Sequence, residues 1–271
     1  MGAPIKMSGD VSVSTPPVQD FPSLVLQLQA TLNAGNENKN SQRVGVLVFR
    51  HSDRPDEHND ETHITEDGKI RIEEYKGILT SHGLDIDSDF VFSSPVIRCV
   101  QTAALMASID ESNVQKVRWV QGSPWNRPNE DEDAACRVKW EDMKSKLGWS
   151  ESRRDWLAGG DAAEGLRDAR ASGKINFDSI FTNVLQPLAL KQAREKTSSV
   201  NTAQSVKSEN ETHTIAVCCT HDICILGLAT NFQSSDIFIP FLGGLFICFD
   251  FNSENVFMKG RNEMSIRRGE S

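Results

Sequence analysis

Six side chains suited to chemistry on an anion fall at three places in the sequence, each at or just beyond the end of a short apolar run. They are Arg50, His51 and Arg54, then Arg98, then His221 and Asp222. Arginine binds oxyanions well because its planar fork donates paired hydrogen bonds and keeps its charge. Phosphoryl transfer needs several such fixed charges around a phosphate dianion, and a nucleophile held in line with the leaving oxygen. The six residues therefore fit a phosphoryl-transfer site.

The apolar runs predict the strands that position these residues. Residues 44–49 and 213–220 read as strands buried on both faces of a parallel sheet, and residues 89–92 as a shorter strand. Helices are expected at about 20–33, 65–81, 96–108, 134–147, 161–171, 176–195 and 222–231, and further strands at 117–120, 244–251 and 255–259. This alternation predicts an α/β fold, a three-layer sandwich with a mainly parallel central sheet and an inserted helical cap region. Ligands of such sheets bind beyond the carboxyl ends of the strands, which is where the six residues fall.

The expected domain organisation has one large unit with short ends. Residues 1–43 are interpreted as an N-terminal tail and helix, 44–260 as the main domain, and 261–271 as a C-terminal tail. Within the main domain, about 120–175 is expected to form the cap insertion. The stretch from about 194 to 212 loses its apolar periodicity and is expected to be a flexible insertion.

Four motifs occur in an order that resembles one known family. They are Arg-His-x-x-Arg at 50–54, Thr-x-x-Gly at 65–68, Ser-Pro-x-x-Arg at 94–98, and a late histidine at 221. Over about residues 44–250 the chain resembles the histidine phosphatase superfamily, also called phosphoglycerate-mutase-like. The resemblance implies a metal-independent phosphatase acting on phosphate monoesters. It also implies that His51 is the nucleophile that forms a phosphohistidine, and that Arg50, Arg54, Arg98 and His221 bind the phosphate.

The proton donor for the leaving oxygen has two candidates. One branch of the family uses the Asp of a His-Asp pair, and Asp222 matches that position. The mutase-like branch uses a later Glu, for which this chain offers only the acidic run 130–133. We prefer Asp222, which could also cap a helix. One departure from the family is Ser52, where a glycine is usual; its side chain could crowd the pocket or add a hydroxyl donor.

Two other functions stay open from the sequence. One is a phosphoglycerate-type mutase, and the other is a catalytically silent relative that binds a phosphorylated ligand or a protein partner. A metal site built from His51, Asp53, His58 and His63 is disfavoured, because the spacing matches no zinc pattern and the neighbouring arginines repel cations. No cofactor and no metal is therefore expected.

Charge and composition limit the classes of partner that the protein is expected to bind. The net charge of −9 and pI of about 5.2 argue against a nucleic-acid or anionic-membrane surface, and no apolar run is long enough to span a bilayer. The expected substrate is a phosphorylated small molecule or a phosphoprotein, while the oligomeric state is left open. Six cysteines without a Cys-x-x-Cys pair are expected to be free and buried. With no secretory signal visible, the expected location is the cytoplasm.

Overall fold

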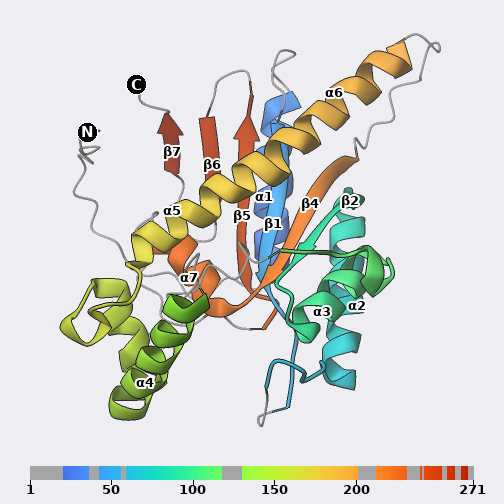
Figure 1. Ribbon diagram of the computed structural model, residues 1–271. Helices are drawn as coiled ribbons and strands as arrows, with labels where there is room; N and C mark the ends of the chain where they lie inside the picture. Colours follow the sequence, from blue (N-terminus) through green and yellow to red (C-terminus); the bar gives the residue numbers. More distant parts are fainter. Residues whose placement is uncertain are drawn as a thin grey trace.

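A seven-stranded sheet forms the centre of the molecule (Figure 1). The structure is a computed structural model that describes residues 21–36, 43–55, 59–117, 130–200, 212–230, 239, 241–251, 255–259 and 264–267. In the order in which they lie side by side, the strands are β3 (Gln115–Lys116), β2 (Leu84–Ser93), β4 (His213–Thr220), β1 (Arg43–Arg50), β5 (Gly244–Asp250), β6 (Asn255–Lys259) and β7 (Met264–Arg267).

The sheet is parallel on one side of β1 and antiparallel on the other. Strands β3, β2, β4 and β1 all point the same way, and β5, β6 and β7 follow as antiparallel neighbours. Because β6 reverses the direction of β5, five of the seven strands share one direction. The predicted α/β class with a mainly parallel sheet is confirmed, with an antiparallel edge added.

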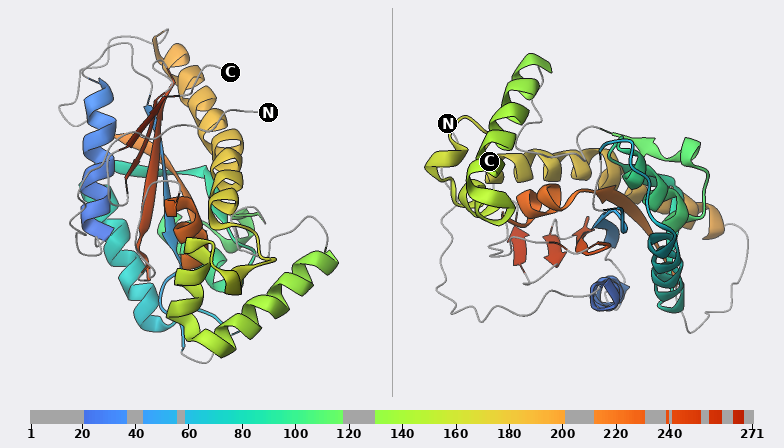
Figure 2. Two further views of the ribbon diagram at one scale, coloured as in Figure 1. Left: turned by 90° about the vertical axis from the view of Figure 1, so that its left-hand side faces the viewer. Right: turned by 90° about the horizontal axis from the view of Figure 1, so that it is seen from below.

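Helices cover both faces of the sheet, which gives the three layers (Figures 1 and 2). The first face carries α1 (Phe21–Asn36), α2 (Glu66–Ser81) and α3 (Ile97–Ala107), and the second carries α5 (Ala169–Ile180), α6 (Gln186–Val200) and α7 (Asp222–Thr230). Alternate residues of β1 supply the two cores: Leu47 and Phe49 pack on the first face, and Val46 and Val48 on the second. Each such side chain stabilises the fold by about 1.5–3 kcal/mol when fully buried.

The cap is built around α4 (Glu130–Ala158), a long helix interrupted at Gly148, whose φ is 77°. Figure 1 shows α4 beyond the end of the sheet to which β1 and β4 run. It packs through Trp140 and Trp156 against the first residues of α7, including Ile223. The cap therefore has its own small apolar core, and it faces the carboxyl ends of the parallel strands.

Two segments in the second half of the chain differ from the prediction. Residues 161–171 form no long helix, because Gly165, at a φ of 85°, breaks the pattern and α5 begins only at Ala169. Segment 194–200, expected to be flexible, is the last part of a helix that runs from α5 through the π-helical η4 (Phe181–Leu185) and α6 to Val200. Its Arg, Glu and Lys residues at 194–196 form helix well without an apolar face. Residues 201–211 lie outside the described residues.

The chain ends also differ in part from the prediction. The expected C-terminal tail, 261–271, contains β7, which pairs with β6 and so satisfies backbone groups that a tail would leave to water. The expected strand at 117–120 is represented by β3 at Gln115–Lys116, and residues 118–120 lie outside the described part. The expected tail before α1, residues 1–20, also lies outside it.

Candidate active site

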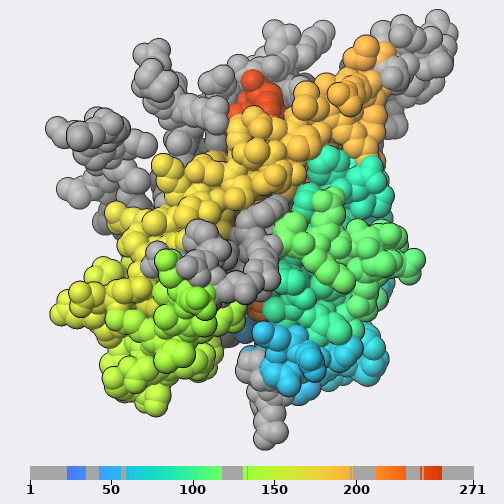
Figure 3. All heavy atoms as spheres, in the orientation of Figure 1, coloured from blue at the N-terminus to red at the C-terminus, as the bar shows by residue number. Residues whose placement is uncertain are grey.

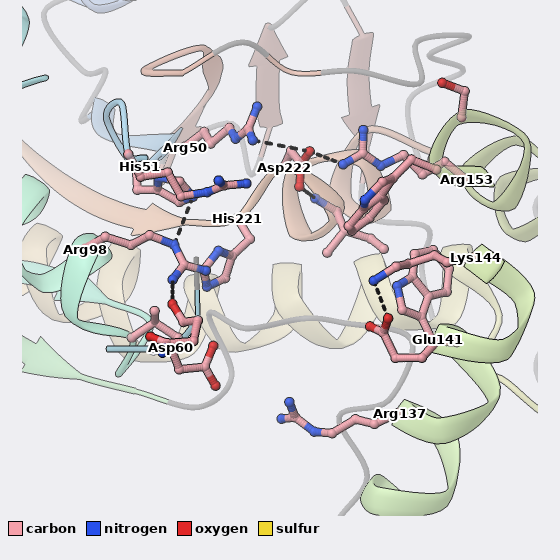
Figure 4. Close-up of a pocket in the computed structure, with 17 residues that line it drawn as sticks. Arg50, His51, Asp60, Arg98, Arg137, Glu141, Lys144, Arg153, His221 and Asp222 are labelled. Atoms are coloured by element: carbon pink, nitrogen blue, oxygen red, sulfur yellow. Dashed lines mark hydrogen bonds and ion pairs between the residues drawn. The ribbon is translucent and has the colours of Figure 1, made fainter. Parts of the chain in front are cut away.

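The candidate site lies where three neighbouring parallel strands end. Strands β2, β4 and β1 are adjacent, so their carboxyl ends meet at one edge of the sheet. Two backbone bonds hold the first residues of the loops in register there: His51 N–H donates to Thr220 O at 3.0 Å, and Ser94 N–H donates to Cys219 O at 3.0 Å. The structure thereby brings together the motifs that follow the three strands (Figure 4).

His51 is held with one ring nitrogen fixed and the other facing Arg98. Its Nδ1 lies 2.8 Å from Ser52 O, and a carbonyl oxygen can only accept, so Nδ1 carries the proton. In the neutral ring, Nε2 then bears the lone pair, and it accepts a hydrogen bond from Arg98 Nε at 3.3 Å. The backbone therefore selects the tautomer in which Nε2 is the nucleophilic nitrogen.

The surroundings of His51 keep its ring neutral. The side chain is only 2% exposed. Burial lowers the pKa of His51 well below its ordinary value of 6.5, and the charges of His221, Arg50 and Arg98 lower it further, while the bond to Ser52 O opposes them. Burial is the largest of these causes.

Arg50 and Arg98 lie on either side of His51 and are themselves fixed. Arg50 donates from Nη1 to Ile239 O at 2.6 Å, and its guanidinium stacks 4.3 Å from the centre of the Phe241 ring. Arg98 donates from Nη1 to Asn59 O at 2.7 Å. Burial lowers the pKa of Arg50, although its charge persists at any ordinary pH. Two buried guanidinium groups therefore face the same space as the His51 ring.

Arg54 and His221 complete the set predicted from sequence. Arg54 lines the cavity and donates to Pro55 O at 2.9 Å. His221 meets the His51 ring edge to face, with 5.4 Å between ring centres. Its Nε2 lies 3.3 Å from Ser94 Oγ and 3.6 Å from Cys99 Sγ. All three predicted arginines and both predicted histidines thus line one cavity.

Asp222 lies in the same cavity and is bound by an arginine that the sequence did not single out. Arg153, on α4, donates from Nη2 to Asp222 Oδ2, and both side chains are about 10% exposed. Arg50 Nη2 lies 3.8 Å from the same oxygen, and the N–H of Ile223 donates to Oδ1 at 2.8 Å. The last bond runs to the next residue, whereas a helix cap accepts from a backbone N–H two or three residues on, so it is not the cap expected of Asp222. The carboxylate is thus the counter-ion of two guanidinium groups.

Two of the other predicted proton donors lie outside the cavity. Asp131 and Glu132, from the acidic run 130–133, are exposed in the first turn of α4 and do not line it. The side chains of Glu130 and Asp133 lie outside the described part. Glu141 does line the cavity, but its side chain is 64% exposed. Among the predicted acids whose side chains the structure describes, Asp222 is therefore the one in the cavity.

Ser52 turns away from the cavity and supports the loop from behind. It is fully buried; its Oγ donates to Gly68 O at 2.9 Å, and its N–H donates to Thr102 Oγ1 at 3.1 Å. The Thr-x-x-Gly motif has a matching role, because Thr65 Oγ1 caps α2 by accepting from Gly68 N–H at 3.1 Å. A Cβ on Gly68 would lie 2.9 Å from Asp53 O, so glycine is needed for this close approach. The hydroxyl of Ser52 neither crowds the pocket nor donates into it.

The remaining predictions concern metal ligands and cysteines. His63 bonds to Gln101 Nε2 at 2.7 Å and is exposed, and His58 lies outside the described residues. Within the described ranges, no cluster of three or more His, Cys, Asp or Glu side chains could hold a metal ion. All six cysteines are free and buried, as predicted. In the same part of the chain, none of the helices has the length and apolarity required to cross a membrane.

The cavity has two walls of different origin. One is the carboxyl edge of the sheet with His51, and the other is the face of α4 that carries Arg137, Lys144 and Arg153 (Figure 4). Its volume is about 760 Å³. In Figure 3 the hollow lies between the atoms of α4 and those of the segment that follows β1. The α4 residues had a signal in the sequence, since 137, 140, 141 and 144 share one helical face, but nothing indicated that this face meets His51.

Comparison with known proteins gives likenesses of fold only. No family model and no curated protein matches the sequence. A solved phosphoglycerate mutase from Bacillus anthracis str. Sterne is 12% identical with a TM-score of 0.45, covering 78% of this chain and 89% of that one. A mycobacterial glucosyl-3-phosphoglycerate phosphatase is 12% identical with a TM-score of 0.41, covering 80% and 97%. The chain is similar in fold to these two proteins. Sequence identities and TM-scores this low carry no argument about function, which has to be inferred from the side chains in the cavity.

Proposed function

We propose that this chain is a metal-independent phosphatase of the histidine phosphatase superfamily, which hydrolyses phosphate monoesters through a phosphohistidine at His51. The observation that carries the proposal is the His51 ring. Its Nδ1 is bonded to Ser52 O, and its Nε2 lone pair faces the cavity between Arg50 and Arg98. A neutral imidazole held in one tautomer beside fixed guanidinium groups has what a phosphate dianion requires of a nucleophilic site.

In the first step, His51 Nε2 attacks the phosphorus atom and the bond to the leaving oxygen breaks. Arg98 Nε, now bonded to Nε2, turns its donor to a phosphoryl oxygen when the dianion binds, because a charged acceptor forms the stronger hydrogen bond. Arg50, Arg54 and His221 bind the remaining phosphoryl oxygens. As the N–P bond forms, Ser52 O stabilises the positive charge on the ring by accepting from Nδ1.

Asp222 gives its proton to the leaving oxygen. A bound phosphate dianion would compete with Asp222 for Arg50, which would free the Asp222 carboxyl group to face the leaving oxygen. In the second step Asp222 takes a proton from water, the water oxygen attacks phosphorus, and the N–P bond breaks. Inorganic phosphate leaves and His51 is neutral again.

The test is hydrolysis of p-nitrophenyl phosphate in excess EDTA by wild type and His51→Ala, with acid-labile phosphate on the protein measured after rapid quenching. We expect activity that survives the chelator, a labile phosphoprotein in wild type, and loss of both in the variant. His63→Ala, at an exposed histidine outside the cavity, is the matched control and should behave as wild type. Equal activity in His51→Ala and wild type would overturn the proposal.

The same experiment separates the alternatives. A mutase would show the phosphoprotein but transfer its phosphate to a second phosphorylated acceptor much faster than to water. A silent relative would bind phosphate without forming any phosphoprotein.

A further inference from the structure

The wall of the cavity opposite His51 is one face of a helix. Arg137, Trp140, Glu141 and Lys144 are spaced three, four and seven residues apart on α4, so they share one side of it, and all four line the cavity. In Figure 4 the side chain of Arg137 extends from α4 into the space between the two walls. The mechanism described above uses none of these four residues.

This face is cationic and partly preorganised. The Lys144 ammonium lies 4.3 Å from the centre of the Trp149 ring, and the Arg153 guanidinium lies 4.7 Å from the same centre. The Lys144 side chain is 19% exposed, so its stem is already ordered against the protein. Its carboxylate neighbour, Glu141, lies 2.5 Å away and is 64% exposed, so Glu141 can turn to solvent when another anion arrives.

The charge of the cavity contrasts with that of the whole chain. Six cationic side chains and three carboxylates line it, although the protein carries a net charge of −9. Of the carboxylates, Asp222 is bound by Arg153 and Glu141 by Lys144, and Asp60 lies on the wall opposite α4 (Figure 4). Phosphate binding at His51 accounts for Arg50, Arg54 and Arg98. It does not account for cations on the far wall.

The size of the cavity also indicates a substrate larger than a phosphoryl group. A volume of about 760 Å³ lies within the range of roughly 300–1,000 Å³ typical of sites for whole small molecules. A phosphoryl group at His51 fills a small part of that space. The rest of the substrate must therefore extend from the sheet edge toward α4.

We propose that Arg137 and Lys144 form a second anion-binding subsite, so that the preferred substrate is a small phosphate monoester with another anionic group at its far end. This inference rests on the proposed function, since it takes the reacting phosphate to be at His51. The distal group can be a carboxylate or a second phosphate, because both accept charge-assisted hydrogen bonds from arginine and lysine.

The test compares three matched substrates on the same alkyl chain, in graded lengths: an n-alkyl phosphate, its ω-carboxylate and its ω-phosphate. For wild type we expect kcat/KM to be about tenfold or more higher for a substrate with a distal anion, as one charge-assisted bond allows. Arg137→Gln and Lys144→Gln should reduce that preference toward unity, mainly by raising KM. Arg137→Lys should restore part of it. The ω-carboxylate and ω-phosphate arms identify the anion.

Lys146→Gln is the matched control, because Lys146 is an exposed α4 lysine that pairs with Asp142 and does not line the cavity. It should keep the wild-type preference. A long-range effect of charge would act on the extra charge of the substrate, so it would lower the preference by the same factor in Lys146→Gln and Arg137→Gln. That result, or an unchanged preference in Arg137→Gln, would overturn the subsite.

A binding experiment separates this inference from the proposed function. Calorimetric titration with an n-alkyl phosphonate and its ω-carboxylate, which cannot be hydrolysed, should show about tenfold tighter binding of the second ligand, lost in Arg137→Gln. This readout needs no catalysis, so an inactive protein can still support the subsite. Equal affinity of the two ligands at every chain length would refute it, even if His51 proves to be the nucleophile.

Discussion

Asp222→Asn should slow phosphoryl transfer according to how much the leaving group needs a proton. The amide cannot donate an acidic proton, yet it keeps the shape of the side chain, and its single oxygen can still accept from either Arg153 or Ile223 N–H. An alkoxide leaves poorly without a proton, whereas p-nitrophenolate is a stable anion. The variant should therefore lose far more activity on an alkyl phosphate than on p-nitrophenyl phosphate.

The size of the effect follows from general acid catalysis, which contributes about 10²- to 10⁴-fold. We expect kcat/KM for the alkyl phosphate to fall by about that factor and kcat/KM for p-nitrophenyl phosphate to fall by less than about tenfold. The quantity kcat/KM is the right measure, because it reports steps through the departure of the leaving group. Hydrolysis of the phosphohistidine, in which Asp222 acts as base, affects only kcat.

The change also has a cost in stability that must be separated from catalysis. Neutralising a buried carboxylate bound by Arg153 and Arg50 should lower the free energy of unfolding by about 1–3 kcal/mol. Asp250→Asn is the matched control: Asp250 is 4% exposed, pairs with Arg43 at 3.2 Å, and lies outside the cavity. It should lose similar stability and keep kcat/KM for both substrates. Equal loss on both substrates in Asp222→Asn would refute the role of Asp222 as the acid.

Three further predictions concern the support of the nucleophile. The pKa of His51 is lowered below 6.5 in the folded protein, so just below that pH only the unfolded chain binds the proton. Stability that is present above pH 6.5 is therefore lost as the pH falls. His51→Gln should remove about 1 kcal/mol of that loss, measured by urea unfolding at about pH 5.5. Gly68→Ala should destabilise the protein by about 1–3 kcal/mol and lower kcat, because the new Cβ would meet Asp53 O. The control is Gly77→Ala on the same helix, where a Cβ would meet no atom. It should be neutral or stabilising by up to about 1 kcal/mol in the same urea unfolding and activity assays. Ser52→Ala should cost about 1 kcal/mol of stability in urea unfolding and keep kcat, because its hydroxyl bonds Gly68 O behind the site; a large loss of kcat without loss of stability would contradict this.

The sequence determined much of the sheet and the part of the site that follows it. Continuous apolar runs at 44–49 and 213–220 can only be strands with both faces covered, and they became β1 and β4. Since the carboxyl ends of parallel neighbours meet at one edge, His51, Arg98 and His221 had to lie close together once those strands paired. Local rules also gave α2 its cap at Thr65.

The antiparallel edge of the sheet and the continuation of α6 to Val200 depend on interactions that the apolar pattern of the sequence does not reveal. Strand β7 forms because it pairs with β6. A segment this short has too weak a strand propensity for the sequence alone to predict it. The polar end of α6 has an intrahelical bond from Thr197 Oγ1 to Ala193 O at 2.9 Å. Loss of apolar periodicity therefore indicated an exposed segment, and that segment is helical as far as Val200.

Only the tertiary structure decided what faces His51. The spacing of Arg137, Trp140 and Lys144 shows that they share a face of α4, but a helical face can turn toward any neighbour. The packing of Trp140 and Trp156 on α7 orients that face toward the sheet edge, which also carries Arg153 to Asp222. Sequence patterns fix local conformation and burial, whereas the meeting of a cap helix and a strand end depends on contacts between residues far apart in the chain.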